Sequence, residues 1–174
     1  MPPAEEARAW PIPAVDVSLY TFASAVSSVT LVEGWTAKDT AKFEEAAKAL
    51  VETNPILTAR LKRSWGGDVT AVEGGYDVSS RVSACSLADD APAAAAAAEG
   101  DAAGLCAEAR AYERLFPNLG TTLDQMLTGG PLFHAGVVAL PDGRAAYCLS
   151  LSHAIGDGWT YYRLGRALRR GMPG

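Results

Sequence analysis

The spacing of apolar and polar positions predicts two amphipathic helices and several short strands. Apolar residues recur every three or four positions over Thr36–Thr53 and again over Gly158–Arg170, which is the period of a helix with one buried face. Thr36, with Asp39 three residues later, is typical of a capping box, and Pro55 should end the first helix. Runs rich in β-branched residues and bounded by glycine or proline predict the strands. These runs are Val15–Glu33, Leu57–Trp65, Val69–Val72, Val78–Leu87, Leu132–Leu140 and Arg144–Ser152.

The order of these elements predicts a mixed α/β protein, a two-layer sandwich whose sheet is largely antiparallel. The three runs between Leu57 and Leu87 suggest an antiparallel meander, and Pro141-Asp142-Gly143 is a hairpin signal. A two-residue loop at that hairpin would place His134 opposite Leu151 and bring both histidines to one face of the sheet. Cys148, Ser150 and Ser152 would then occupy the other face.

The middle of the chain has a different composition. Ala88–Gly100 contains six consecutive alanines and offers little volume for packing, so we interpret it as a surface insertion, either a loose helix or a disordered segment. Ala102–Leu115 has apolar residues at helical spacing and predicts a further helix.

Composition narrows the classes of protein. With 174 residues, 49% of them hydrophobic, the chain can form one domain with a substantial core. A net charge of -5 leaves no broad basic surface for nucleic acid. The N-terminus lacks the features of a secretion signal, no run reaches the length of a membrane helix, and three scattered cysteines (Cys85, Cys106 and Cys148) suggest neither a disulfide framework nor a zinc knuckle. We therefore expect a cytoplasmic protein.

The stretch Leu149–Trp159 carries the candidate chemistry. His153 ends an apolar strand, and Asp157 and Gly158 follow in a turn before a helix. A histidine placed in this way can serve as a general base. The alternative is structural: His153 is a hydrogen-bonded residue at the strand end, and Asp157 only caps the helix. His134 fits a half-buried structural residue better than a catalytic one.

Other kinds of site find less support. Two histidines and scattered carboxylates do not predict a metal site. A serine or cysteine nucleophile activated by His153 is disfavoured, because the nearby candidates lie on the opposite face of the strand.

The stretch His153-Ala154-Ile155-Gly156-Asp157-Gly158 resembles the H-x-x-x-D-G motif of the chloramphenicol acetyltransferase-like superfamily. That superfamily includes BAHD acyltransferases, wax ester synthases and condensation domains of peptide synthetases. The segment from Asn54 to Leu61 and the triplet Pro131-Leu132-Phe133 resemble further parts of the pattern. Two departures are Ser152, where many members have a first histidine, and the short distance from the motif to Gly174. The resemblance therefore implies a single N-terminal lobe over residues 1–174.

The resemblance also implies an activity, namely transfer of an acyl group from a thioester to a hydroxyl or amine. His153 would be the general base, Asp157 would hold the loop by pairing with an arginine, and Gly158 would leave room for substrate. No bound cofactor is implied, since acyl-CoA or an acyl-carrier thioester is a co-substrate.

Three functional hypotheses stay open, and each has its own expected partners. The chain is an acyltransferase lobe completed by self-association or by a second-lobe polypeptide, a carrier-dependent condensation-type enzyme, or a non-catalytic binding module with the same fold.

Overall fold

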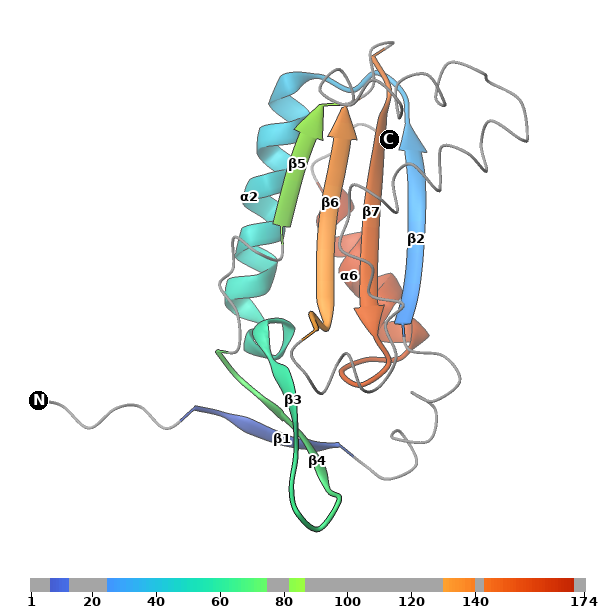
Figure 1. Ribbon diagram of the computed structural model, residues 1–174. Helices are drawn as coiled ribbons and strands as arrows, with labels where there is room; N and C mark the ends of the chain where they lie inside the picture. The colour runs from blue at the N-terminus through green and yellow to red at the C-terminus, as the bar shows by residue number, and fades with distance from the viewer. Residues whose placement is uncertain (1–6, 13–24, 75–81, 87–129, 140–142, 171–174) are drawn as a thin grey trace, which may run out of the picture.

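The computed structural model describes residues 7–12, 25–74, 82–86, 130–139 and 143–170. These residues form two β-sheets, with two long helices on one face of the larger sheet (Figure 1). No helix in these ranges is long and apolar enough to cross a membrane. The alanine-rich insertion and the helix expected after it lie outside the described residues.

The larger sheet is a layer of four strands in the order β2-β7-β6-β5. These strands are β2 (Ala25–Val32), β7 (Ala145–Ser152), β6 (Phe133–Ala139) and β5 (Val82–Ser86). β7 is antiparallel to both of its neighbours, whereas β5 runs parallel to β6. The predicted mixed, largely antiparallel sheet is confirmed. The meander is wrong in its third strand, because β5 joins this sheet instead of pairing with the strand before it.

The smaller sheet has the order β1-β4-β3 and lies beyond one end of the larger one (Figure 1). It consists of β1 (Ala9–Ile12), β4 (Val69–Val72) and β3 (Arg60–Arg63), all antiparallel. β1 tolerates Pro11 because it is an edge strand, where a missing N–H group is acceptable. β3 begins later than predicted because Pro55–Thr58 forms a short 3₁₀ helix, η1.

The pairing of β6 with β7 differs by one residue from the prediction. His134 lies opposite Ser150, not Leu151, and regular pairing ends at Ala139 and Ala145. The connection therefore has an odd number of residues, where the prediction assumed a two-residue loop. Because strand side chains alternate, this shift moves His134 to the other face of the sheet.

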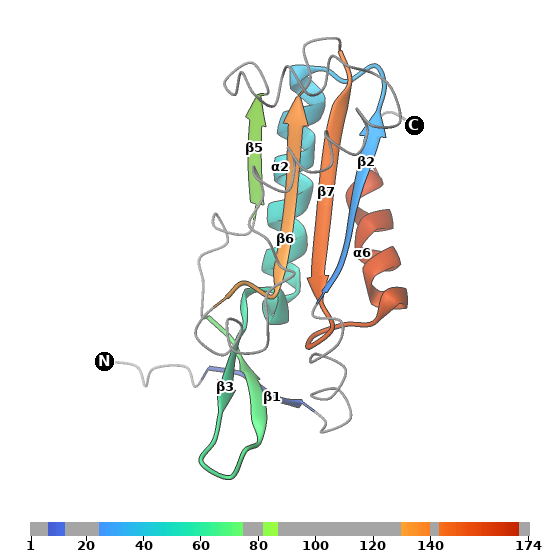
Figure 2. The ribbon, with the colours of Figure 1, turned by 45° about the vertical axis from the view of Figure 1, so that its right-hand side comes forward.

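Helices α2 (Ala37–Thr53) and α6 (Gly158–Arg169) cover the same face of the larger sheet (Figure 2). The predicted start of α2 is confirmed, since the Asp39 carboxylate accepts a hydrogen bond from the Thr36 backbone N–H at 3.0 Å. Odd-numbered residues of β6 and β7 enter the core between the sheet and the helices. Its largest members include Phe43, Phe133, Tyr147, Leu149, Leu151 and Leu168.

Candidate functional site

His153 lies in a tight turn directly after β7. The Ile155 N–H donates to the Ser152 carbonyl at 3.1 Å, which closes a β-turn with His153 at its second position. His153 is partly exposed, whereas the strand before it is buried along its whole length. The turn thus presents the imidazole at the boundary between core and solvent.

Ser152 fixes the first half of this turn. It is fully buried, its backbone N–H donates to the Leu132 carbonyl at 2.7 Å, and its Oγ accepts from the Ala154 N–H at 3.2 Å. The residue before His153 is therefore held by main-chain and side-chain contacts together. The sequence analysis treated Ser152 as a departure from a motif and as a disfavoured nucleophile, and the signal it missed is that serine side chains often bond to the backbone near a turn.

Ala154 and Ile155 hold the other side of the turn. Ala154 is buried in the core of the smaller sheet, and Ile155 packs against the cores of both sheets. The turn is therefore fixed by the meeting of two apolar clusters at the end of the larger sheet.

Gly156 is required by packing. A Cβ atom at this position would lie 2.7 Å from Leu151 Cδ2 and 2.9 Å from Thr160 Cγ2. At Gly158, a Cβ atom would meet nothing within 4 Å. The open space beside Gly158 is compatible with the room for substrate that the motif resemblance implies. The fold itself needs glycine at Gly156, which is a variable position of the motif.

Asp157 is the N-cap of α6. Its Oδ1 accepts hydrogen bonds from the Thr160 backbone N–H and from the Thr160 hydroxyl, both at 2.8 Å. These bonds, the backbone one first, lower the pKa of the Asp157 carboxyl below its usual value. Within the described ranges no arginine forms an ion pair with it. The capping role is therefore visible, and the arginine partner stays a prediction.

Tyr161 ties α6 to the sheet. Its hydroxyl group donates to the Leu149 carbonyl at 3.2 Å and is hydrogen-bonded to the Ser28 hydroxyl of β2. Burial raises the pKa of the Tyr161 phenol, so the hydroxyl stays protonated at neutral pH. This contact fixes the helix that begins five residues after His153.

The two histidines occupy different environments. His134 is 1% exposed and lies on the face of the sheet opposite the helices, in register with Ser150. Ser150 in turn is hydrogen-bonded to Ser27 of β2 through the two Oγ atoms at 2.6 Å. The observed register therefore contradicts the prediction that both histidines lie on one face of the sheet. Among the described residues, no three side chains of His, Cys, Asp or Glu are grouped to hold a metal ion.

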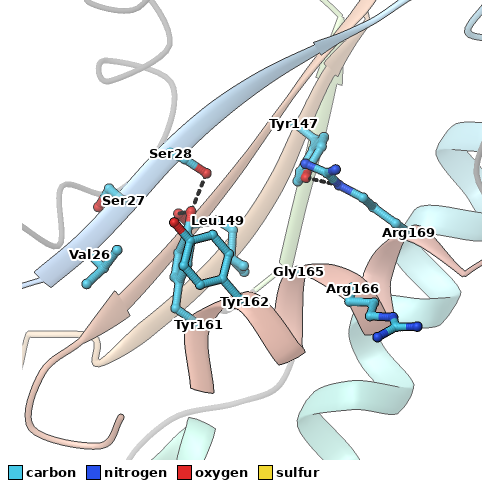
Figure 3. A pocket seen from close by; sticks show the side chains of 10 residues that line it. All are labelled: Val26, Ser27, Ser28, Tyr147, Leu149, Tyr161, Tyr162, Gly165, Arg166 and Arg169. Carbon is cyan, nitrogen blue, oxygen red and sulfur yellow. Dashed lines mark hydrogen bonds between the residues drawn. The ribbon is translucent and has the colours of Figure 1, made fainter. Parts of the chain in front are cut away.

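A groove of about 470 Å³ runs beside α6 and the edge strand β2 (Figure 3). It begins near Leu149 and Tyr161 and extends to Arg166 and Arg169. No pattern in the sequence predicted this groove, because it depends on how α6 lies on β2 and β7.

Comparison with known proteins identifies the fold. No protein-family model and no curated protein sequence matches the chain. Among solved structures, it is similar to the starter condensation domain of rhizomide synthetase RzmA, with 17% identity and a TM-score of 0.63 over 92% of this chain and 36% of that one. A mutant of the same domain, solved in complex with C8-CoA, gives 16% identity and a TM-score of 0.64 over 92% of this chain and 34% of that one.

A third similar structure is described as the molecular basis for condensation domain-mediated chain release from the enacyloxin polyketide synthase. It shares 18% identity and a TM-score of 0.59 over 97% of this chain and 30% of that one. The chain thus spans about a third of the length of these proteins. Its architecture is the chloramphenicol acetyltransferase-like fold of condensation domains, as the sequence predicted.

Proposed function

We propose that this chain is an acyltransferase lobe that moves an acyl group from a thioester to a hydroxyl or amine, with His153 as general base. The observation that carries the proposal is the turn after β7, which fixes the backbone around a partly exposed histidine from both sides. The fold supports it, since a condensation domain of the same architecture has been solved with C8-CoA.

The proposed chemistry needs one proton carrier. A nitrogen of the His153 imidazole takes the proton of the acceptor hydroxyl or amine while the acceptor atom attacks the thioester carbonyl. The tetrahedral intermediate then loses the thiolate as the C–S bond breaks, and the imidazolium returns the proton to sulfur. General acid–base catalysis of this kind contributes about 10²- to 10⁴-fold to a rate.

Asp157 acts through structure in this proposal. Its carboxylate caps α6 and so fixes where the turn ends, four residues after His153. Gly158 adds no side chain at the start of the helix, which leaves open space next to the turn. The chain spans about a third of its structural neighbours, so we propose that a further polypeptide segment or a second subunit completes the substrate site.

The test is release of free thiol from octanoyl-CoA or from an octanoyl N-acetylcysteamine thioester, in the presence of a panel of amines and alcohols. The purified chain is assayed together with its natural partner segment, where the gene encodes one. His153→Ala should reduce turnover by roughly 10²-fold or more while circular dichroism and melting temperature stay near those of the parent, because His153 is partly exposed.

Two variants sharpen the comparison. His153→Gln retains hydrogen-bonding capacity without basicity and should be as inactive as His153→Ala. Lys62→Gln changes an exposed residue of β3 and serves as the control. Full turnover by either His153 variant would exclude the general-base role.

A further inference from the structure

The groove beside α6 contains aromatic and cationic side chains that have no role in the proposed acyl transfer. It is concave, and its volume of about 470 Å³ falls in the range of small-molecule sites. Val26 and Leu149 contribute apolar surface from the strands, and the rings of Tyr161 and Tyr162 contribute it from α6 (Figure 3). The far end carries the cationic pair Arg166 and Arg169. The groove is therefore mainly apolar, with Ser27 and Ser28 of β2 as polar residues in its lining, and it is cationic at one end.

Arg169 is held in place at that end. Its Nε–H donates to the Tyr147 hydroxyl at 2.6 Å, and its guanidinium carbon lies 5.4 Å from the centre of the Tyr147 ring (Figure 3). Tyr147 itself is buried, so the contact has a rigid base. The two terminal amino groups of Arg169 have no partner among the described residues. A guanidinium oriented in this way is prepared to bind an oxyanion.

The charge around the groove is unbalanced. Between Gly158 and Arg170 the chain has four arginines and no acidic residue, although its net charge is -5. Arginines three or four positions apart on a helix repel each other. No ion pair within the described ranges involves any of these four arginines. An anionic occupant would relieve the repulsion.

The helix dipole offers a simpler reason for part of this pattern. Arg166 and Arg169 lie in the last turn of α6, where cations are favoured. That effect operates equally on side chains that extend into solvent, so it does not explain why Arg169 is bound to a buried tyrosine at the groove. The polar floor is also occupied, since the Tyr161 hydroxyl already bonds to Leu149 and Ser28. The anion of a ligand would therefore sit at the arginine end.

We infer that the groove binds a small phosphate ester, with its phosphate at Arg166 and Arg169 and its organic part along Leu149 and the rings of Tyr161 and Tyr162. A phosphate group carries about -1.5 to -2 charges at neutral pH and three acceptor oxygens, which suits two guanidinium groups better than a single carboxylate does.

Such an ester has two potential sources. One is a free phosphorylated metabolite. The other is the phosphorylated pantetheine arm of the thioester donor, and this source rests on the proposed function. The phosphate would sit at Arg169, whose partner Tyr147 is six residues before His153, about 20 Å along an extended chain. A pantetheine arm is comparable with an extended peptide of about five residues, roughly 17 Å, which is shorter than that separation, so the spacing favours the free metabolite.

The test is calorimetric titration of the purified chain with phenyl phosphate, benzoate and 4′-phosphopantetheine. Phenyl phosphate and benzoate share an aromatic ring and differ in the anion. Arg166→Gln and Arg169→Gln should each weaken binding of phenyl phosphate about tenfold or more. Arg166→Lys should recover part of the affinity. Arg163→Gln is the matched control, because Arg163 lies on the same helix but outside this groove.

Saturable 1:1 binding that depends on Arg166 and Arg169 but not on Arg163 supports the inference. Tighter binding of 4′-phosphopantetheine than of phenyl phosphate assigns the donor arm as the source, and the reverse order assigns a separate metabolite. Absence of saturable binding, equal affinity for benzoate, or an equal effect of Arg163→Gln overturns it. Turnover of the N-acetylcysteamine thioester, which lacks phosphate, tests the chemistry at His153 independently, so the two proposals can fail separately.

Discussion

Replacing Gly156 with alanine should destabilise the protein, because the fold leaves no space for a side chain there. The added Cβ would lie 2.7 Å from Leu151 Cδ2, 2.9 Å from Thr160 Cγ2 and 3.1 Å from Thr160 Cβ. Leu151 is fully buried between the sheet and the helices, so its methyl group has little freedom to move. Thr160 is bound through its backbone and hydroxyl to the Asp157 cap. Relief therefore requires the start of α6 to shift away from β7.

The magnitude follows from other overpacked cores, where an extra carbon lowers the free energy of unfolding by about 1–3 kcal/mol. In a chain of this size, each kcal/mol shifts the melting temperature by about 2–4 °C. Gly156→Ala should therefore melt roughly 2–12 °C lower than the parent. Thermal melts followed by circular dichroism, together with urea denaturation, measure both quantities.

Gly158→Ala is the matched control. It adds the same carbon two residues away, where nothing lies within 4 Å, and it adds a better helix former at the first position of α6. Its melting temperature should equal or exceed that of the parent. If the space beside Gly158 admits substrate, this variant should lose turnover without losing stability. Equal melting temperatures for Gly156→Ala and the parent would refute the packing argument.

Two further predictions concern the cap and the assembly state. Asp157→Ala should lower the melting temperature more than Asp157→Asn, because asparagine keeps an oxygen that can accept from the Thr160 N–H. Because the folded-state pKa of Asp157 is lowered, its contribution to stability is present above the unfolded pKa of about 3.9 and is lost as the pH falls through the folded value. Melting temperatures measured between neutral pH and pH 3 should therefore depend less on pH for Asp157→Asn than for the parent. The purified chain should associate, because Trp159 and Tyr162 are 71% and 73% exposed on α6, and light scattering that shows a monomer at all concentrations would contradict this.

Local signals in the sequence predicted the helices and the strand–turn–helix unit well. The Thr36 and Asp39 pair found the start of α2, and Asp157 was recognised as a candidate cap for α6. Each of these features depends on residues within one turn of each other, so the chain carries the information locally. The buried strand before His153 could likewise be recognised from its apolar run.

Non-local features could not be predicted in the same way. β5 pairs with β6, which lies about fifty residues further along the chain, and no spacing rule chooses that partner over β4. The register of β6 against β7 depended on one residue in the connection, and that residue decided the face on which His134 lies. The contact between Arg169 and Tyr147 joins residues 22 positions apart across the helix–sheet interface. Neither the spacing of apolar residues nor the composition carries information about pairings between residues so far apart in the chain.

The position of His153 follows from the way the two sheets meet. Ile155, two residues after it, packs against the core under the helices and against the core of the smaller sheet. Ser152, the residue before it, is tied to the Leu132 carbonyl at the start of β6. The backbone of the turn is therefore set by residues on either side of His153 that contact the core under the helices, the core of the smaller sheet and the start of β6. A short motif can mark where such a histidine lies, and the packing of both sheets determines how firmly the turn holds it.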